Sequence, residues 1–180
     1  MTKPKIASDW LAACAGCHMS LLDIDERIVE IAKLVDIRAT PITDLKEPDE
    51  EGVDVGILTG AVNTTTNEEV AHTMRERCKI LVSLGDCAVF GGVIAMRNFF
   101  EIDDALRRAY VETESTDEEG KVPSSPELGV PTPVRALHEV VDVDVFVPGC
   151  PPDADVIYYV LSELAHGRIP ELKGENLQWH

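Results

Sequence analysis

Four of the five cysteines in this chain lie where a strand should end and a loop should begin. They are Cys14 and Cys17, which form a C-x-x-C after the apolar residues 6–13, Cys87 after residues 80–84, and Cys150 after residues 143–148. In an open α/β sheet, the loops at the carboxyl ends of parallel strands converge on one edge. Three separate loops can therefore bring four thiolates to one point, where they would bind a metal ion or an iron–sulfur cluster.

Strand-like and helical segments alternate along the chain, which predicts an α/β fold. We expect strands at residues 4–13, 37–42, 53–59, 80–84 and 141–147, and helices at residues 18–35, 67–78, 95–100, 102–110, 133–139 and 154–166. Asn67 and Asp153 are the expected N-caps of two of these helices. Right-handed crossovers then give an open, mostly parallel sheet with helices on both faces, and they place the strand ends on one edge.

The length of the chain favours one domain, because 180 residues are enough for a single core and leave little room for a second. The least regular part is segment 111–133. From Glu112 onward it holds six acidic residues and four prolines, so we expect a long acidic loop. Loops of this length in compact domains are usually functional or disordered.

The charge balance excludes some classes of partner. The formal net charge is −17, from 33 acidic and 16 basic residues, which argues against binding nucleic-acid phosphates or anionic lipid. No apolar run approaches the roughly 18 residues that span a bilayer. The N-terminal apolar stretch is short and broken by Asp9, so we expect no secretory signal and a cytoplasmic protein. In that reducing compartment, five cysteines indicate metal binding or redox chemistry.

The spacing of the cysteines favours a [4Fe–4S] cluster over zinc. Structural zinc sites usually use two close pairs of cysteines, whereas here one C-x-x-C is joined by two widely separated single residues. Cys150 also precedes Pro151, and a Cys-Pro step recurs in cluster-binding loops. A cube is larger than a single ion and accepts ligands from loops that lie farther apart. Zinc remains the chemical alternative.

Residues beside the cysteines are expected to support the site. Four glycines border them and could offer backbone amides to the cluster, namely Gly16, Gly85, Gly91 and Gly149. Asp86 and Asp153 flank the same loops and are candidates for contacts behind the ligands or at an interface. His18 could replace a thiolate, but with four cysteines available we expect it to pack against the neighbouring loop. Cys78, on the flank of a helix, is expected to be a buried apolar residue.

Four segments of the chain are specific in combination. They are residues 14–22 (CAGCHMSLL), residues 83–88 (SLGDCA), Gly91-Gly92 and residues 148–152 (PGCPP). Together they resemble the small subunit of [NiFe] hydrogenases, most closely the soluble, NAD-reducing (bidirectional) type. The resemblance implies a flavodoxin-like fold, a single domain over residues 1–180, and one proximal [4Fe–4S] cluster. The iron ligands that it implies are Cys14, Cys17, Cys87 and Cys150.

The same resemblance implies a function in electron transfer. A large subunit would carry the Ni–Fe centre, and diaphorase subunits would bind FMN, NAD and further iron–sulfur clusters. This chain would catalyse no bond chemistry itself and would relay electrons between them in the reaction H2 + NAD+ = NADH + H+. Neither nucleic acid nor a membrane is an implied partner. Many relatives carry an acidic residue in the loop after the third strand, where this chain reads TGAV at residues 59–62, so we expect no carboxylate proton path there.

Three other interpretations stay open. The cluster-bearing subunit of NADH:quinone oxidoreductase is similar around Gly91-Gly92 and residues 148–152, although it usually begins its site with adjacent cysteines. A zinc-binding assembly subunit without redox function is an alternative of another class. A flavodoxin-like flavin carrier is the third, because the first loop could cradle a phosphate, but that loop holds cysteines here.

Overall fold

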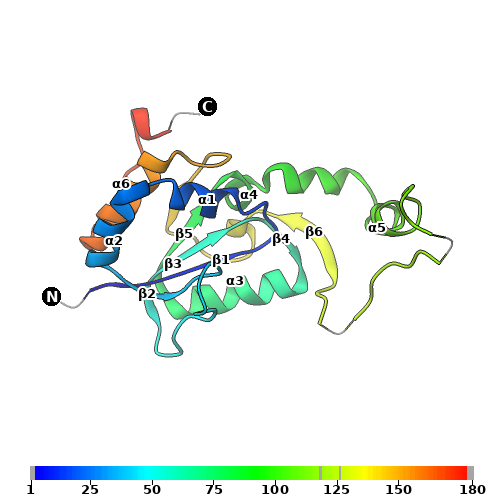
Figure 1. Ribbon diagram of the computed structural model, residues 1–180, viewed down its shortest axis with the longest axis horizontal. Helices are drawn as coiled ribbons and strands as arrows, with labels where there is room; N and C mark the ends of the chain where they lie inside the picture. Colours follow the sequence, from blue (N-terminus) through cyan, green and yellow to red (C-terminus); the bar gives the residue numbers. More distant parts are fainter. Residues whose placement is uncertain (1–2, 118, 126, 178–180) are drawn as a thin grey trace.

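A central parallel sheet of five strands organises the protein (Figure 1). The computed structural model describes residues 3–117, 119–125 and 127–177. The strands of this sheet are β1 (Lys5–Trp10), β2 (Asp36–Ala39), β3 (Val53–Thr59), β5 (Cys78–Leu84) and β7 (Val145–Val147). Their order is β2-β1-β3-β5-β7, which is the flavodoxin-like order for five consecutive strands, so the predicted fold class is confirmed.

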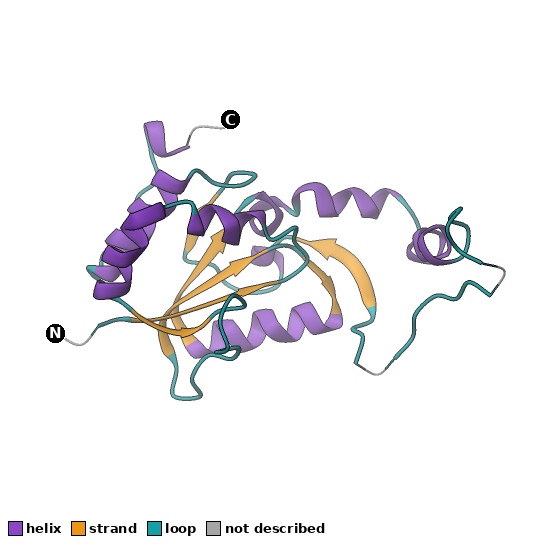
Figure 2. Cartoon of the chain, viewed as in Figure 1, coloured by secondary structure: helices purple, strands orange, loops and turns teal. Residues whose placement is uncertain are grey.

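Helices cover both faces of the sheet, as expected (Figure 2). The α-helices are α1 (Gly16–Leu22), α2 (Ile28–Leu34), α3 (Thr65–Arg77), α4 (Asp86–Phe90), α5 (Ile102–Tyr110) and α6 (Ala154–Ala165). The 3-10 helices are η1 (Asp25–Arg27), η2 (Gly92–Phe99), η3 (Leu137–Glu139) and η4 (Gly174–Leu177). Among the residues described, no helix is both long and apolar enough to cross a bilayer.

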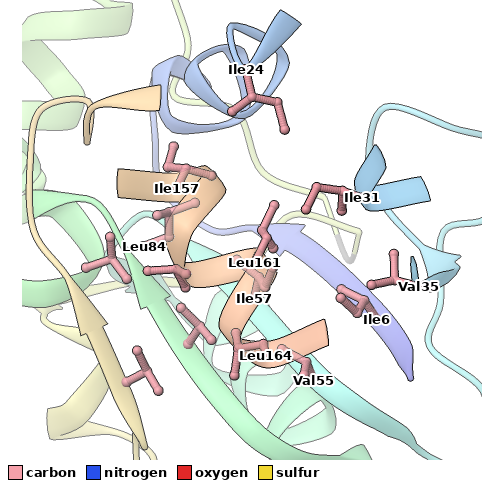
Figure 3. Packing of buried hydrophobic residues seen from close by; sticks show 14 residues of the cluster. Ile6, Ile24, Ile31, Val35, Val55, Ile57, Leu84, Ile157, Leu161 and Leu164 are labelled. Atoms are coloured by element: carbon pink, nitrogen blue, oxygen red, sulfur yellow. The ribbon is translucent and has the colours of Figure 1, made fainter. Parts of the chain in front are cut away.

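Buried apolar residues form one cluster on each face of the sheet. On the first face, strand residues pack against α2 and α6, as Figure 3 shows for Ile6, Ile31, Ile57, Leu161 and Leu164. On the second face, the cluster includes Ala7, Leu58, Leu81, Ala71 and Met74. Successive strand residues point to opposite faces, which is why Ile57 and Leu58 belong to different clusters. Truncating the fully buried Leu58 to alanine would cost about 2–5 kcal/mol.

Several element boundaries differ from the predictions. The helix expected over residues 18–35 is broken into α1, η1 and α2, with Asp25 at a positive φ of 55°. The N-cap of α3 is Thr64 rather than Asn67, because the Thr64 hydroxyl accepts the Asn67 amide at 3.2 Å. Asp153 caps α6 as predicted and accepts the Asp155 amide at 2.8 Å. Cys78 is the C-cap of α3, as its predicted place at the flank of a helix implies, and it also begins β5.

A small second sheet was not predicted. Strand β4 (Val62–Thr64) pairs antiparallel with β6 (Pro131–Arg135). Of the helix predicted at residues 133–139, only η3 over Leu137–Glu139 forms, because residues 131–135 are extended. The acidic loop therefore ends at residue 130, slightly before its predicted end, and its residues 118 and 126 lie outside the described part of the chain.

Candidate metal centre at the sheet edge

The first cysteine loop is folded over the end of β3. After β1, Leu11 donates its amide to the carbonyl of Thr59 at 2.7 Å, and Ala12 pairs with Ala61 in an isolated bridge. Ala15 then adopts a left-handed backbone conformation, with φ 66°, that turns the chain into α1. This conformation costs an alanine roughly 1–2 kcal/mol. It brings Cys17 into the first turn of the helix, just after Cys14.

The Cys87 loop reaches the same place from β5. Gly85 follows the last residue of the strand and donates its amide to the carbonyl of Val147 at 2.7 Å. Its φ is +88°, and a Cβ placed on it would lie 2.2 Å from the Cys17 Sγ and 3.5 Å from the Gly149 carbonyl oxygen. Glycine is therefore required here, because any side chain would occupy the space of the Cys17 sulfur. The contact also shows that three loops meet at Gly85.

The Cys150 loop is held by both of the others. The Gly149 amide donates to Asp86 Oδ1 at 2.7 Å, and the Asp86 amide donates to the Gly149 carbonyl at 2.9 Å. From α1, the Ser20 hydroxyl donates to the Pro152 carbonyl at 2.5 Å. These bonds tie the loops that carry the four predicted site cysteines to one edge of the sheet, as expected from its topology.

The four thiols influence one another electrostatically. Burial raises the pKa of Cys17 to about 12, and the neighbouring Cys87, Cys14 and Cys150 each add to the rise. The pKa of Cys87 is raised by burial and by Cys150 and Cys14. Cys14 and Cys150 are exposed, whereas Cys17 and Cys87 are half-buried. Four thiolates at this edge would repel one another, so a positively charged centre is what would stabilise them together.

Backbone amides at the start of η2 point at Cys87. The amides of Ile94 and Val93 donate to its sulfur and partly offset the rise in its pKa. Gly92 passes so close that a Cβ on it would lie 2.9 Å from the Cys87 Sγ. The sequence interpretation missed these two amides. The sequence feature that could have indicated them is the Gly91-Gly92 pair. It separates α4 from a new helix, and the first amides of a helix have no partner within it.

Most of the glycine amides predicted to face the site have other partners. Gly91 donates to the carbonyl of Cys87 at 3.0 Å, the Gly85 amide to Val147 at the end of β7, and the Gly149 amide to Asp86. Only Gly16, of the four, donates to a cysteine sulfur, at 3.4 Å from the Cys14 Sγ. The other three glycines serve the site by their backbone geometry and by the small space that they occupy.

His18 points into the protein and not at the sulfurs. Its ring is buried, with Nε2 3.3 Å from the Ser8 hydroxyl and Nδ1 3.2 Å from the Thr59 hydroxyl. Ser8 donates to Thr40 at 2.9 Å, so Nε2–H donates to Ser8 and Nδ1 accepts from Thr59. Burial lowers the pKa of His18, and Trp10 packs edge-on against its ring. The prediction that His18 packs rather than ligates agrees with this geometry.

The fifth cysteine lies elsewhere. Cys78 is buried in the cluster on the α3 face, beside Met74 and Gly56. Its pKa is raised, chiefly by burial. This position agrees with the prediction that it is a core residue, and it makes Cys78 a natural control for experiments on the other four.

The donor set fits a cluster of iron and sulfur. Thiolates are the ligands of such clusters. The absence of a side chain at Gly85 and Gly92 leaves room for the sulfurs of Cys17 and Cys87 themselves. Within the described ranges, no three His, Cys, Asp or Glu side chains are placed to ligate one metal ion.

Comparison with known proteins places this arrangement in a family. The profile described as "NADH ubiquinone oxidoreductase, 20 Kd subunit" matches residues 14–164, which include the four cysteines predicted to form the site. The chain is 43% identical to the NAD-reducing hydrogenase HoxS subunit delta of Cupriavidus necator, over 92% of this chain and 80% of that one. It is 31% identical to the sulfhydrogenase 2 subunit delta of Pyrococcus furiosus, over 91% of this chain and 62% of that one.

Solved structures agree with this relationship. One chain of a NAD+-reducing [NiFe]-hydrogenase, crystallised in the H2-reduced state, superposes with a TM-score of 0.94 at 36% identity, covering 99% of this chain and 100% of that one. A [NiFeSe]-hydrogenase chain of Desulfomicrobium baculatum superposes with a TM-score of 0.58 at 18% identity, covering 97% of this chain and 68% of that one, which shows a shared fold.

Proposed function

The chain belongs to the family of [NiFe]-hydrogenase small subunits, of the NAD-reducing type, and we propose that it relays electrons through one [4Fe–4S] cluster. The observation that carries the proposal is the meeting of three loops at Gly85, where the Cys17 sulfur and the Gly149 carbonyl both approach its backbone. We assign the four iron ligands to Cys14, Cys17, Cys87 and Cys150, within a single domain over residues 1–180.

When bound, the cluster supplies one-electron transfer, and the chain supplies its position and environment. The amides of Val93 and Ile94 favour negative charge on the Cys87 sulfur. Asp86 and Ser20 hold the ligand loops against one another. Hydrogen bonds to the sulfurs and partial burial are the means by which a protein sets the potential of such a centre.

The relay needs partners at both ends. We place the Ni–Fe centre in a large subunit that contacts the surfaces around residues 14–20 and 150–153, and FMN, NAD and further iron–sulfur clusters in diaphorase subunits. The complex would reduce NAD+ with H2 in the cytoplasm, with no bond chemistry in this chain. The second candidate function is that of a cluster-bearing subunit in a complex like NADH:quinone oxidoreductase, favoured by the description of the matching family.

Replacing one ligand in the complete complex tests the proposal. We expect Cys87→Ser to lose iron, acid-labile sulfide and absorption near 400 nm from this subunit, and to abolish NAD+ reduction by H2. Cys78→Ser is the matched control, because that buried cysteine lies outside the site, and it should keep all three properties. Full iron content and NAD+ reduction in Cys87→Ser, or zinc in the anaerobically purified protein, would contradict the proposal. Electron transfer from NADH to quinone without H2 turnover would favour the second candidate.

A further inference from the structure

The 3-10 helix η2 presents apolar residues to solvent. Because a 3-10 helix has three residues per turn, Val93, Met96 and Phe99 lie one above another along it. Their exposed fractions are 63%, 60% and 83%, and that of Phe100, which follows the helix, is 68%. We call Val93, Met96, Phe99 and Phe100 the η2 ridge. Contiguous exposed apolar side chains of this kind mark interaction surfaces.

Polar residues of the same helix are turned toward the protein and fix its orientation. The Asn98 side-chain nitrogen donates a hydrogen bond to the carbonyl of Val134, and its oxygen accepts one from the Val134 amide, both at 2.8 Å. The side chain thus pairs with β6 in the way that the backbone of a neighbouring strand would. Arg97 donates to the carbonyls of Thr132 and Asn63. A surface helix normally turns its apolar stripe to the core. In η2 the arrangement is inverted and held by hydrogen bonds, so the ridge is already ordered for a partner.

The charges beyond the ridge indicate what that partner carries. Glu101, Asp103 and Asp104 follow Phe100 directly. Asp104 is paired with Arg107 at 3.1 Å, whereas Glu101 and Asp103 form no ion pair with any residue that the structure describes. A second copy of this chain, whose net charge is −17, would bring acidic residues against acidic residues. A different protein with Lys or Arg around an apolar groove fits the ridge.

The ridge begins at the candidate metal centre. Gly92 is the first residue of η2 and packs on Cys87, and the Val93 amide donates to the Cys87 sulfur. From there the green segment after α4 runs away from the sheet toward α5 (Figure 1). A protein that covers the ridge therefore also covers the edge at which electrons would enter or leave.

We infer that the η2 ridge docks into an apolar groove with a basic rim on the hydrogenase large subunit. This inference rests on the proposed function, because it assigns the partner that exchanges electrons at this edge. The ridge supplies the apolar centre of the contact, and Glu101 and Asp103 supply its charged rim. The interface thus extends from the cysteine loops along the whole of η2.

Charge placed on the ridge tests the inference. In a complex reconstituted from this chain and its purified large subunit, we expect Met96→Glu combined with Phe99→Glu to weaken association roughly 30-fold or more, because buried aromatic contacts dominate interfaces. Phe99→Ser, which adds no charge, should weaken it about tenfold. Val29→Glu on α2 is the matched control, because Val29 is also an exposed apolar helix residue, at 52%, and its variant should bind as the wild type does.

The outcomes separate this inference from the proposed function. All ridge variants should keep the iron and sulfide content and the far-UV circular dichroism of the wild type, whereas Cys87→Ser loses iron. Wild-type affinity for the large subunit in the double variant and in Phe99→Ser would overturn the inference. So would a loss of binding to the diaphorase subunits alone, or self-association of the isolated wild-type chain that the double variant abolishes.

Discussion

Asp86 and Gly149 exchange two hydrogen bonds across the candidate metal centre. The Gly149 amide donates to Asp86 Oδ1 at 2.7 Å, and the Asp86 amide donates to the Gly149 carbonyl at 2.9 Å. Each of these residues immediately precedes a predicted ligand, Cys87 in one loop and Cys150 in the other. The pair therefore sets the separation of two thiols that come from different strands.

Removing the Asp86 carboxylate should loosen the Cys150 loop. We expect Asp86→Ala to cost about 1–3 kcal/mol locally, because the Gly149 amide loses its charged acceptor. Hydrogen exchange of that amide should be at least about tenfold faster than in the wild type. Asp86→Asn is the control, because its side-chain oxygen can still accept the hydrogen bond from Gly149. Exchange of the Gly149 amide should therefore be slower in Asp86→Asn than in Asp86→Ala. Equal exchange rates in the wild type and Asp86→Ala would refute this assignment.

A methyl group at Gly85 should displace the Cys17 sulfur. Gly85→Ala puts a Cβ 2.2 Å from the Cys17 Sγ and also strains a backbone with φ +88°. Gly167→Ala separates the two effects, because Gly167 has φ +72° with nothing within 4 Å of its Cβ. Both variants should lose roughly 1–3 kcal/mol in denaturant unfolding from the backbone strain. Only Gly85→Ala should also lose iron, and iron contents that fall together would contradict the role given to this glycine.

The edge of the sheet at which the cysteine loops meet was predictable from the sequence, because two general rules of α/β folds determine its position. Alternation of strands and helices sets a parallel sheet, and right-handed crossovers bring the ends of β1, β5 and β7 together. Strand β3, with its run of buried residues, was predicted to the residue at Val53–Thr59. Local pattern and chain topology were sufficient for the placement of all three cysteine loops.

Features that depend on distant residues were not predictable. The β4–β6 pair joins Val62 to Arg135 across the acidic loop, and a three-residue strand has no readable period of its own. The partners of the amides of Gly85 and Gly149 are Val147 and Asp86, which are distant in sequence, so sequence position alone suggested that these amides face the cluster. The break between α1 and α2 interrupts an apolar period that continues through it, because Asp25 adopts a positive φ.

His18 should be needed for the fold around the first cysteine loop. His18→Leu would leave the buried hydroxyls of Ser8 and Thr59 without the ring nitrogens that they now contact. We expect a loss of about 1–3 kcal/mol in the free energy of unfolding, since an unpaired buried polar group carries that cost. Thermal and denaturant unfolding of the cluster-free chain measure it. His18→Gln, which can donate and accept, should recover part of the stability, and a neutral His18→Leu would show that the hydroxyls find other partners.

The ion pair of Asp144 and Arg75 should make stability depend on pH. Burial alone would raise the pKa of Asp144, but the Leu81 amide at 2.7 Å and Arg75 at 2.6 Å outweigh it and lower this pKa below its usual value. The stabilisation is therefore complete above about pH 4 and is lost as pH falls through the lowered pKa. At pH 7, Asp144→Asn should cost about 1 kcal/mol, a value reduced for the partial exposure of the pair.

Urea unfolding at a series of pH values should show that the difference in unfolding free energy between Asp144→Asn and the wild type shrinks in acid. Glu171→Gln, at an exposed surface pair, is the control and should change nothing measurable. A difference that stays constant below about pH 3 would show that the carboxylate charge is not what stabilises this corner of the sheet.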